Sequence, residues 1–273
     1  MFIFLWIIIV LLVLSLLFLY LIKPNKKRDT SYFENKMYAH RGLHDEEVSE
    51  NSLTAFKKAK EAGFGVELDV QLTKDDVLVV FHDGNLKRMC GIDGELKNYT
   101  YEELCQYRLK NTGDKIPTFK EVLSLLEDMD LICEIKGNNG NANYHICERT
   151  YEEIKDYKGK YMIESFSPLL IAWFKTHHPE IIRGQLSSGF RTNKEEGPLI
   201  NFCMRHLLFN VFSRPDFIAY KHADYKEFGL SVVRKLYKPF LVAWTARGPV
   251  ELESAKKNFD AVIFEKNARE VEE

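Results

Sequence analysis

The stretch VELDVQLTKDDVLVVFHD, from Val66 to Asp83, contains two apolar runs, and charged residues interrupt or end each of them. Four residues, TKDD, separate the runs, too few for the crossover that joins parallel neighbours. The stretch therefore predicts an antiparallel hairpin. If the turn is centred between Lys74 and Asp75, Glu67 lies opposite His82. A slip of one or two positions still leaves the histidine near Glu67 or Asp69.

Outside this hairpin, strand patterns alternate with helix patterns along the chain. Strands are predicted at 37–40, 66–71, 131–135, 161–165, 182–186, 216–220, 240–244 and 260–264. Helices are predicted between them, among others at 52–63, 117–128, 168–177 and 249–258. Eight such units indicate an α/β protein with a closed (β/α)₈ TIM barrel, to which the returning hairpin strand is an addition. A doubly wound open sheet is the alternative. The polar segment 84–115 after the second barrel strand predicts a small insertion.

The first 22 residues contain no charged side chain, and about 20 apolar residues suffice for a helix to cross a bilayer. The segment lacks the basic start and the small-residue cleavage site of a secretory signal. It also has no polar face, which argues against a helix of a soluble core. We expect a transmembrane anchor at 1–22, a basic linker at 23–36 and the barrel domain at 37–273.

Charge and cysteine content indicate where the domain lies. Lys23, Lys26, Lys27 and Arg28 follow the apolar segment directly, and basic flanks favour the cytoplasmic side. We therefore expect a single-pass membrane protein with a cytoplasmic domain, whose basic flank can touch anionic headgroups. The net charge of −2 argues against a nucleic-acid partner. Five dispersed cysteines without a C-x-x-C pair favour a reducing compartment.

Three acidic residues stand inside apolar strand patterns. Side chains two positions apart on a strand share a face, so Glu67 points with Asp69, and Glu134 points with Lys136. In a barrel both pairs would face inward near the carboxyl ends of the strands, where barrel active sites lie. One such acid alone would be read as a surface or ion-paired residue. Three together in apolar runs indicate a divalent cation held by oxygen ligands, because unpaired buried charge is costly.

Two histidines end predicted strands on the same side of the barrel. His40 ends the first strand and His82 ends the hairpin, and a pair of imidazoles can serve as general acid and base. Each histidine alone would more simply be a packed or surface residue. Arg41 and Lys136 suit phosphate oxygens, and Gly42 allows the backbone to turn Arg41 inward. Together with a metal, these groups predict a site for a phosphodiester.

The same residues follow an ordered motif pattern that resembles the glycerophosphodiester phosphodiesterase family. The matching motifs are His40-Arg41-Gly42, Glu50-Asn51, Ala55-Phe56, Glu67-x-Asp69, His82-Asp83, Pro117-Thr118, Glu134-Ile135-Lys136, Ser165-Phe166 and Trp244-Thr245. They extend over residues 37 to about 265. No single motif is specific, but their order and spacing are.

This resemblance implies a TIM barrel that binds one divalent metal ion, Ca²⁺ or Mg²⁺. Glu67, Asp69 and Glu134 would be its ligands, His40 and His82 the acid and base, and Arg41 and Lys136 the phosphate-binding residues. It implies hydrolysis of glycerophosphodiesters to glycerol 3-phosphate and an alcohol. In relatives a small insertion like 84–115 covers the glycerol.

The chain departs from the family pattern at several positions. Ser49 and Ser52 replace the usual proline and threonine, which affects loop shape. Arg247 and Glu265 stand where asparagine and aspartate are usual, so the pocket rim can differ. Phe166 and Trp244 either form an apolar pocket wall or pack in the core. Glu50 and Asn51 either steady His40 or Arg41 or belong to the helix cap near Ser52.

Other functions remain open. A lysophospholipase D that acts on membrane lysolipids would need an apolar groove, for which segment 207–217 is the candidate. A non-catalytic binding module and a metal-dependent isomerase are weaker alternatives, because the catalytic set is complete and Arg41 and Lys136 favour a phosphate. The sequence predicts neither the head group nor the oligomeric state.

Overall fold

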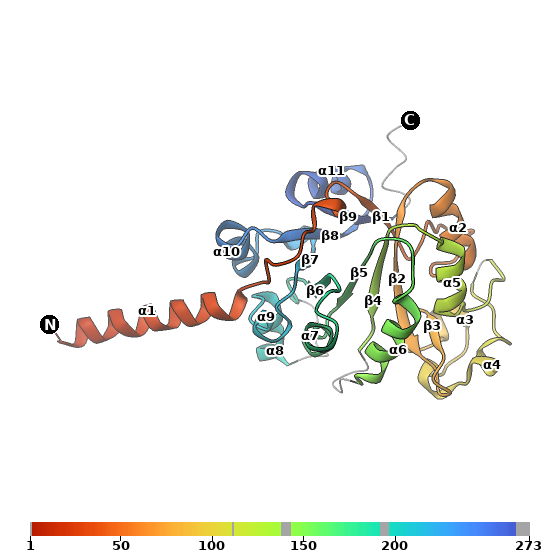
Figure 1. The fold of residues 1–273 in the computed structure, drawn as a ribbon, viewed down its shortest axis with the longest axis horizontal. Coiled ribbons are helices and arrows are strands. Elements are labelled where there is room, and N and C mark those ends of the chain that lie inside the picture. The colour runs from red at the N-terminus through yellow and green to blue at the C-terminus, as the bar shows by residue number, and fades with distance from the viewer. Residues whose placement is uncertain (1, 111, 138–142, 192–196, 266–273) are drawn as a thin grey trace.

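Eight parallel strands form a closed barrel in the computed structural model, which describes residues 2–110, 112–137, 143–191 and 197–265. Figure 1 shows the strands ringed by helices. The barrel strands are β1 (Met37–His40), β2 (Gly65–Leu72), β4 (Leu131–Ile135), β5 (Tyr161–Ser165), β6 (Arg183–Ser187), β7 (Phe217–Lys221), β8 (Phe240–Ala246) and β9 (Ala261–Phe264).

Strand β1 closes the barrel because it pairs on both of its sides. Tyr38 is in register with Gly65 of β2 and with Ile263 of β9. The remaining strands follow in the order β9-β8-β7-β6-β5-β4-β2. The predicted (β/α)₈ barrel is confirmed, and the alternative of an open sheet is wrong because β1 is not an edge strand.

Helices cover the outside of the strands. They are α2 (Leu53–Glu61), α5 (Phe119–Leu126), α6 (His145–Ile154), α7 (Pro168–His177), α8 (Pro198–Arg205), α9 (Asn210–Ser213), α10 (Phe228–Leu236) and α11 (Pro249–Asn258). Ser52 caps α2, because its side chain accepts the Ala55 N–H at 3.0 Å. Thr118 and Glu121 form a capping box at the start of α5.

The hairpin is present, but its expected register is wrong by one position. β3 (Leu78–Val80) runs antiparallel to β2, with Val70 opposite Val80. The turn holds three residues rather than two, since the Thr73 N–H donates to the Val77 carbonyl at 3.0 Å. Asp76 takes a left-handed conformation, with φ of 67°, as three-residue hairpin loops require. Glu67 is therefore not opposite His82, which lies beyond the end of β3.

The segment expected to be an insertion has a small core of its own. It contains α3 (Lys87–Cys90), the 3₁₀ turn η2 (Leu96–Asn98) and α4 (Tyr101–Leu104). The apolar side chains of this core pack with those of β3 and include Val79, Phe81, Leu86, Met89, Leu96, Leu104, Leu109 and Ile116.

The linker packs against the amino ends of the strands and closes that end of the barrel. Its 3₁₀ turn η1 (Ser31–Phe33) inserts Phe33, which is 3% exposed, into a cluster with Tyr38, Phe217 and Phe240. Lys36 Nζ lies 2.6 Å from Asp130 Oδ2 just before β4. The catalytic side chains expected at the carboxyl ends are therefore at the opposite end of the barrel.

Helix α1 (Phe2–Ile22) projects away from the barrel, as the red ribbon in Figure 1 shows. Its side chains are exposed along most of its length, and Ile22 at its end is buried. By length and composition it is able to cross a membrane.

Candidate active site

The three predicted acidic ligands meet at the carboxyl ends of β2 and β4. Asp69 and Glu134 are register partners in the sheet, and Glu67 shares the face of Asp69. Glu67, Asp69 and Glu134 are each at most 8% exposed. One oxygen from each carboxylate lies within 4.8 Å of the others. The structure therefore brings together the set that the sequence predicted.

Two cations partly neutralise this cluster. Lys136 Nζ lies 2.7 Å from Asp69 Oδ1 and 2.7 Å from Glu134 Oε1. Arg41 Nε lies 3.4 Å from Asp69 Oδ2. Burial alone would raise the pKa of Asp69, but Lys136 and Arg41 outweigh burial and hold that pKa below its usual range. Asp69 is therefore the carboxylate that keeps its charge.

Nearby positive charge does not fully offset the burial of the other two acids, Glu67 and Glu134. Burial, together with repulsion from Asp69 and Glu134, raises the pKa of Glu67 well above its usual value. Burial also raises the pKa of Glu134 to about 7, against the effect of Lys136 and with the help of Asp69. The site thus lacks positive charge for its three carboxylates.

A hard divalent cation fits this donor set. Calcium binds oxygen ligands at about 2.3–2.6 Å, so two ligands of one ion are up to about 5 Å apart. The separations of up to 4.8 Å between the carboxylate oxygens meet this condition. Glu67 Oε2 is also held in place by the backbone N–H of Arg41 at 3.1 Å. The three acids could therefore hold one metal ion.

A fourth buried acid, which sequence reasoning missed, adjoins the cluster. Glu164 is the register partner of Glu134 on β5 and is 1% exposed. Its Oε2 has no hydrogen-bond partner among the described residues. Burial, followed by repulsion from Glu67 and Glu134, raises its pKa well above the usual value. Its place in the predicted strand 161–165 was the available signal.

Each catalytic histidine candidate has its Nδ1 atom beside a carboxylate. His40 Nδ1 lies 3.2 Å from Glu265 Oε1, and His82 Nδ1 lies 2.7 Å from Asp83 Oδ1. Burial lowers the pKa of His40 to about 4, although the hydrogen bond that His40 donates to Glu265 acts in the opposite direction. Burial also lowers the pKa of His82. A carboxylate at Nδ1 favours the proton there, which leaves Nε2 of each neutral ring for substrate.

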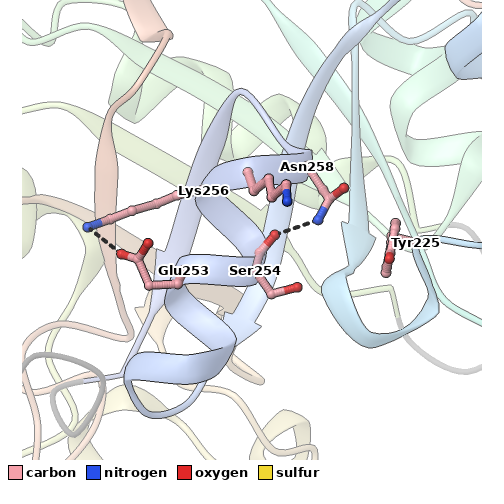
Figure 2. A pocket seen from close by; sticks show the side chains of 6 residues that line it. Tyr225, Glu253, Ser254, Lys256 and Asn258 are labelled. Atoms are coloured by element: carbon pink, nitrogen blue, oxygen red, sulfur yellow. Dashed lines mark hydrogen bonds and ion pairs between the residues drawn. The ribbon is translucent and has the colours of Figure 1, made fainter.

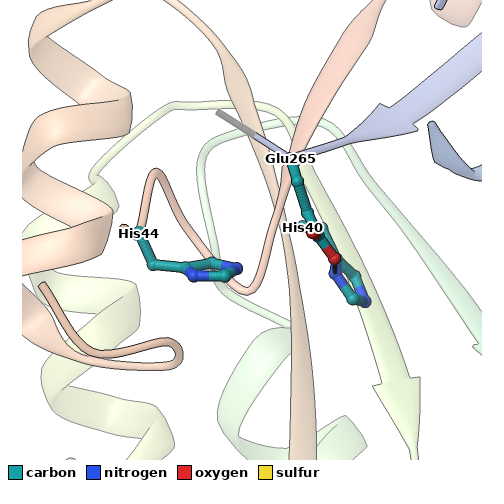
Figure 3. Close-up of side chains that lie close together, drawn as sticks. All are labelled: His40, His44 and Glu265. Carbon is teal, nitrogen blue, oxygen red and sulfur yellow. Dashed lines mark hydrogen bonds and ion pairs between the residues drawn. The ribbon is translucent and has the colours of Figure 1, made fainter. Parts of the chain in front are cut away.

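Figure 3 shows Glu265 reaching the His40 ring from the end of β9, with His44 on the loop that follows β1. Nitrogen or oxygen atoms of these three residues lie within 4.8 Å of one another. Glu265 Oε2 also accepts a hydrogen bond from Arg247 Nε at 3.0 Å. Sequence reasoning treated Glu265 and Arg247 as departures from the family pattern, whereas the structure makes them neighbours of His40.

Backbone turns aim Arg41 into the site. Arg41 and Gly42 have φ values of 55° and 78°, and a Cβ on Gly42 would lie 2.8 Å from Ala55 Cβ. Glycine is needed there both for its conformation and for space. Glu50 binds Arg41 Nη1 at 2.7 Å, as expected. The Asn51 side chain instead donates to Asp69 Oδ2 at 2.8 Å.

Arg88 connects the insertion to the site. Its Nη2 lies 2.6 Å from Glu50 Oε1, and its Nε lies 2.6 Å from Asp83 Oδ2. Because Glu50 holds Arg41 and Asp83 holds His82, one guanidinium supports a phosphate-binding candidate and a catalytic candidate. No pattern in the sequence indicated this role, since Arg88 lies in a polar segment.

The two aromatic pocket candidates lie together at the same end of the barrel. Phe166 and Trp244 pack edge to face, with ring centroids 5.5 Å apart. Both are partly buried over the interior cluster that contains Leu186 and Val242. Trp244 Nε1 is buried without a hydrogen-bond partner among the described residues. Both rings therefore pack on the core, and their role as a wall of the substrate pocket stays a prediction.

A surface hollow of about 700 Å³ lies elsewhere, between α11 and the 3₁₀ turn η3 (His222–Asp224). Figure 2 shows Tyr225, Glu253, Ser254 and Asn258 around it. Its lining residues come from α11 and from Tyr225, which follows η3. It contains none of the predicted catalytic groups.

Comparisons with known proteins identify the family and the fold of this chain. The model of the Glycerophosphoryl diester phosphodiesterase family matches residues 40–235. A Glycerophosphodiester phosphodiesterase of Caldanaerobacter subterraneus is 37% identical over 54% of this chain and 65% of its own length. A human protein named as a lysophospholipase D is 31% identical over 48% of this chain and 52% of its own length. These alignments span about half to two-thirds of the relatives.

Solved structures of similar fold cover more of the chain. The glycerophosphodiester phosphodiesterase from Thermotoga maritima has a TM-score of 0.66 and 28% identity, and covers 87% of this chain and 97% of its own. An Oleispira antarctica phosphodiesterase, solved with sn-glycerol-3-phosphate, has a TM-score of 0.72 at 23% identity over 88% and 96% of the two chains. The second likeness concerns the fold alone. With a family match over most of its length and its motif residues gathered at one end of a barrel, this chain belongs to the glycerophosphoryl diester phosphodiesterase family.

Proposed function

We propose that the protein hydrolyses glycerophosphodiesters to glycerol 3-phosphate and an alcohol, with one divalent metal ion and two histidines. One observation carries the proposal: three acids, two imidazoles and two cations converge at the carboxyl ends of the strands. That constellation suits a substrate with an anionic phosphorus centre and two alcohol oxygens. An isomerase would not need both Arg41 and Lys136.

Glu67, Asp69 and Glu134 would hold Ca²⁺ or Mg²⁺. When bound, the ion would supply positive charge that polarises the phosphoryl oxygen or a neighbouring hydroxyl. Lys136 and Arg41 would contact the phosphate oxygens and stabilise the charge that develops in the transition state. The three acids are buried and the two cations are partly buried, which strengthens these interactions because water screens them poorly there.

The histidines would move the protons. One neutral imidazole accepts the proton of a glycerol hydroxyl as its oxygen attacks phosphorus, and the other ring, which enters this step as the imidazolium, donates its Nε2 proton to the departing alcohol oxygen. The product of this step is a cyclic phosphate. In the second step the roles reverse: one ring activates a water that attacks phosphorus, and the other protonates the glycerol oxygen that leaves. Glu265 and Asp83 hold the rings at Nδ1 for both steps.

The test is a substrate panel with the full chain in detergent, in Ca²⁺ or Mg²⁺ and with an EDTA control. We expect glycerophosphocholine to give glycerol 3-phosphate and choline, and EDTA to abolish turnover. We expect His40→Asn and His82→Asn each to lower kcat by about 10²–10⁴-fold. Turnover that survives EDTA, or a His40→Asn variant as active as the wild type, would contradict the mechanism.

A lysophospholipase D activity is the second candidate. Two observations favour it: the human relative bears that name, and an apolar helix precedes the barrel and is hydrogen-bonded to it. The segment 207–217 contains α9, of which Phe212 is exposed. Assays with lysophosphatidylcholine beside glycerophosphocholine separate the candidates, since turnover of the lysolipid alone would replace the first proposal.

We also propose that α1 crosses the membrane once and that the barrel lies on the cytoplasmic side. The support is the apolar helix itself and the exposed basic residues Lys23, Lys26, Lys27 and Arg28 after it. Protease treatment of sealed, inverted membrane vesicles tests the orientation. Digestion of the barrel from outside these vesicles is expected, and full protection would reverse the proposed orientation.

A further inference from the structure

The end of α1 is bonded to the barrel and not merely tethered to it. The last carbonyls of a helix have no partner within the helix, and barrel side chains satisfy them here. Asn210 Nδ2 donates to the Ile22 carbonyl at 2.9 Å, and Tyr237 Oη donates to the Leu19 carbonyl at 2.9 Å. Arg214 Nη1 donates to the Tyr20 carbonyl at 2.9 Å. These bonds fix the direction in which α1 leaves the barrel.

Exposed apolar side chains gather on the helices around this attachment. Outside α1, the described residues include ten large apolar side chains that are exposed, and six of them belong to α8, α9 and α10. We call five of the six the anchor-side patch: Leu199, Phe202, Phe212, Phe228 and Leu236. Figure 1 shows α8, α9 and α10 on the side of the barrel from which α1 projects.

Ring contacts connect α1 with this patch. Phe18 of α1 stacks on Phe228 at 5.7 Å between centroids. The ring centroids of Phe228 and His206 are 6.3 Å apart. The His206 ring in turn lies 4.6 Å, between centroids, from the ring of Phe202 on α8. The patch therefore continues the apolar surface of α1 onto the barrel.

The length of α1 indicates that lipid covers the anchor-side patch. A helix of 21 residues is about 30 Å long, the thickness of the hydrocarbon core of a bilayer. If α1 crosses the membrane, its end at Ile22 reaches the headgroup level, and so do the side chains around it. Exposed basic residues at this level, among them Lys23, Lys26 and Lys235, suit anionic headgroups. Single exposed apolar residues need no explanation, but a cluster beside a membrane helix does.

We propose that the anchor-side patch is a second membrane-contacting surface, which seats the barrel on the bilayer from which α1 emerges. The occupant is the lipid headgroup and upper acyl region, as for interfacial helices with Phe and Leu on one face. The inference rests on the proposed crossing by α1, and it adds a fixed orientation of the barrel that a flexible tether would not give.

The same surface reaches the catalytic end of the barrel. The last turn of α8 lies against the end of β6, since Ser187 Oγ donates to the Met204 carbonyl at 2.7 Å and Arg205 Nε donates to the Gly189 carbonyl at 2.6 Å. Phe190, next along that loop, packs 6.2 Å from Phe166. Lipid contact through α8 would thus bring the site close to the membrane surface.

Site-directed spin labelling of the full chain tests the proposal in vesicles of phosphatidylcholine and phosphatidylglycerol. The background carries Cys90→Ser, Cys105→Ser and Cys203→Ser and keeps the two buried cysteines, Cys133 and Cys147. Labels are placed by Leu199→Cys and Phe228→Cys in the patch. Val250→Cys on α11, which is 82% exposed in the wild type, is the matched control, and Leu11→Cys reports on α1.

We expect the ratio of collisions with oxygen to collisions with a water-soluble nickel chelate to be several-fold higher at positions 199 and 228 than at position 250. Water-like ratios at 199 and 228, with position 11 in lipid, would overturn the patch and leave the anchor standing. Water-like ratios at position 11 would overturn both. Spin–spin broadening at 199 that depends on protein density would show that a second copy covers the patch, which also overturns the proposal.

Discussion

The two ends of the barrel treat buried charge in opposite ways. At the amino ends, Arg183 Nη1 lies 3.2 Å from Asp216 Oδ2, and Asn25 of the linker donates to the other oxygen of Asp216. At the carboxyl ends, four buried acids share Lys136 and Arg41. The first arrangement pairs one guanidinium with one carboxylate and closes that end of the barrel. The second leaves a deficit of positive charge, which marks the end where a cation and an anionic substrate would bind.

The largest effect is expected at the acidic end. Asp69→Asn removes the carboxylate that stays charged and contacts Lys136, Arg41 and Asn51. We expect kcat/KM for glycerophosphocholine to fall by about 10³-fold, because a proposed metal ligand is lost and Lys136 and Arg41 lose the carboxylate that positions them. Circular dichroism is expected to remain that of a folded barrel. A loss below tenfold would contradict the assignment of Asp69.

A substitution at the amino end of the barrel should lower the stability of the protein and leave its activity unchanged. Asp216→Ala leaves Arg183 buried without its carboxylate, and breaking such a pair costs about 3 kcal/mol. Urea denaturation measures the free energy of unfolding, and kcat per folded molecule is the control. Unchanged stability would mean that this pair does not close the amino end. A large fall in kcat would contradict the expectation that the amino end affects stability and not activity.

Glu265 should affect the reaction through His40. Glu265→Gln keeps the size of the side chain but removes the charge that holds Nδ1–H, and we expect kcat to fall about tenfold. Glu265→Asp is the matched variant, because it retains the carboxylate. A purely structural role would lower stability in both variants and leave the pH profile of kcat unchanged.

The lowered pKa of Glu265 also predicts that the stability of the protein depends on pH. Burial would raise the pKa of Glu265, but hydrogen bonds from His40 and Arg247 outweigh burial and lower that pKa from its usual 4.5 to about 2. Because the folded-state pKa is lowered, the stabilisation is full above pH 4.5 and is lost as the pH falls through about 2. The difference in unfolding free energy between wild type and Glu265→Gln should therefore shrink over this range. A constant difference in urea titrations at several pH values would refute it.

The smallest effect is expected at the attachment of α1. Tyr237→Phe removes the hydrogen bond to the Leu19 carbonyl and should lower stability by about 1 kcal/mol. Catalytic activity on a soluble diester should not change. Thermal unfolding of the full chain in detergent checks the first point, and an unchanged Tm would mean that solvent replaces this bond.

The barrel strands were largely readable from the sequence. The predicted strands 131–135 and 161–165 and the predicted helices 168–177 and 249–258 coincide with β4, β5, α7 and α11. Apolar runs and proline at helix starts are local signals, and local signals suffice for such elements. The hairpin register failed because it depended on the unusual conformation of one residue, Asp76.

The candidate site was readable where spacing on one strand decides it. Glu67, Asp69 and Glu134 followed from alternation, but Glu265 could not, since barrel closure alone brings β9 beside β1. Arg88 was missed for a similar reason, because the fold of the insertion decides where it points. The role of the linker was missed because its polar composition gave no sign that Phe33 is buried.

The central claim is that Glu67, Asp69 and Glu134 bind one divalent cation. Isothermal titration of the metal-free full chain with Ca²⁺ and with Mg²⁺ tests it most directly, with Glu67→Gln as the comparison and Asp216→Asn at the closed end as the matched control. We predict one ion bound per wild-type chain, unchanged binding by the control and no measurable binding by Glu67→Gln. Absence of binding to the wild type, or equal binding by Glu67→Gln, would contradict the claim.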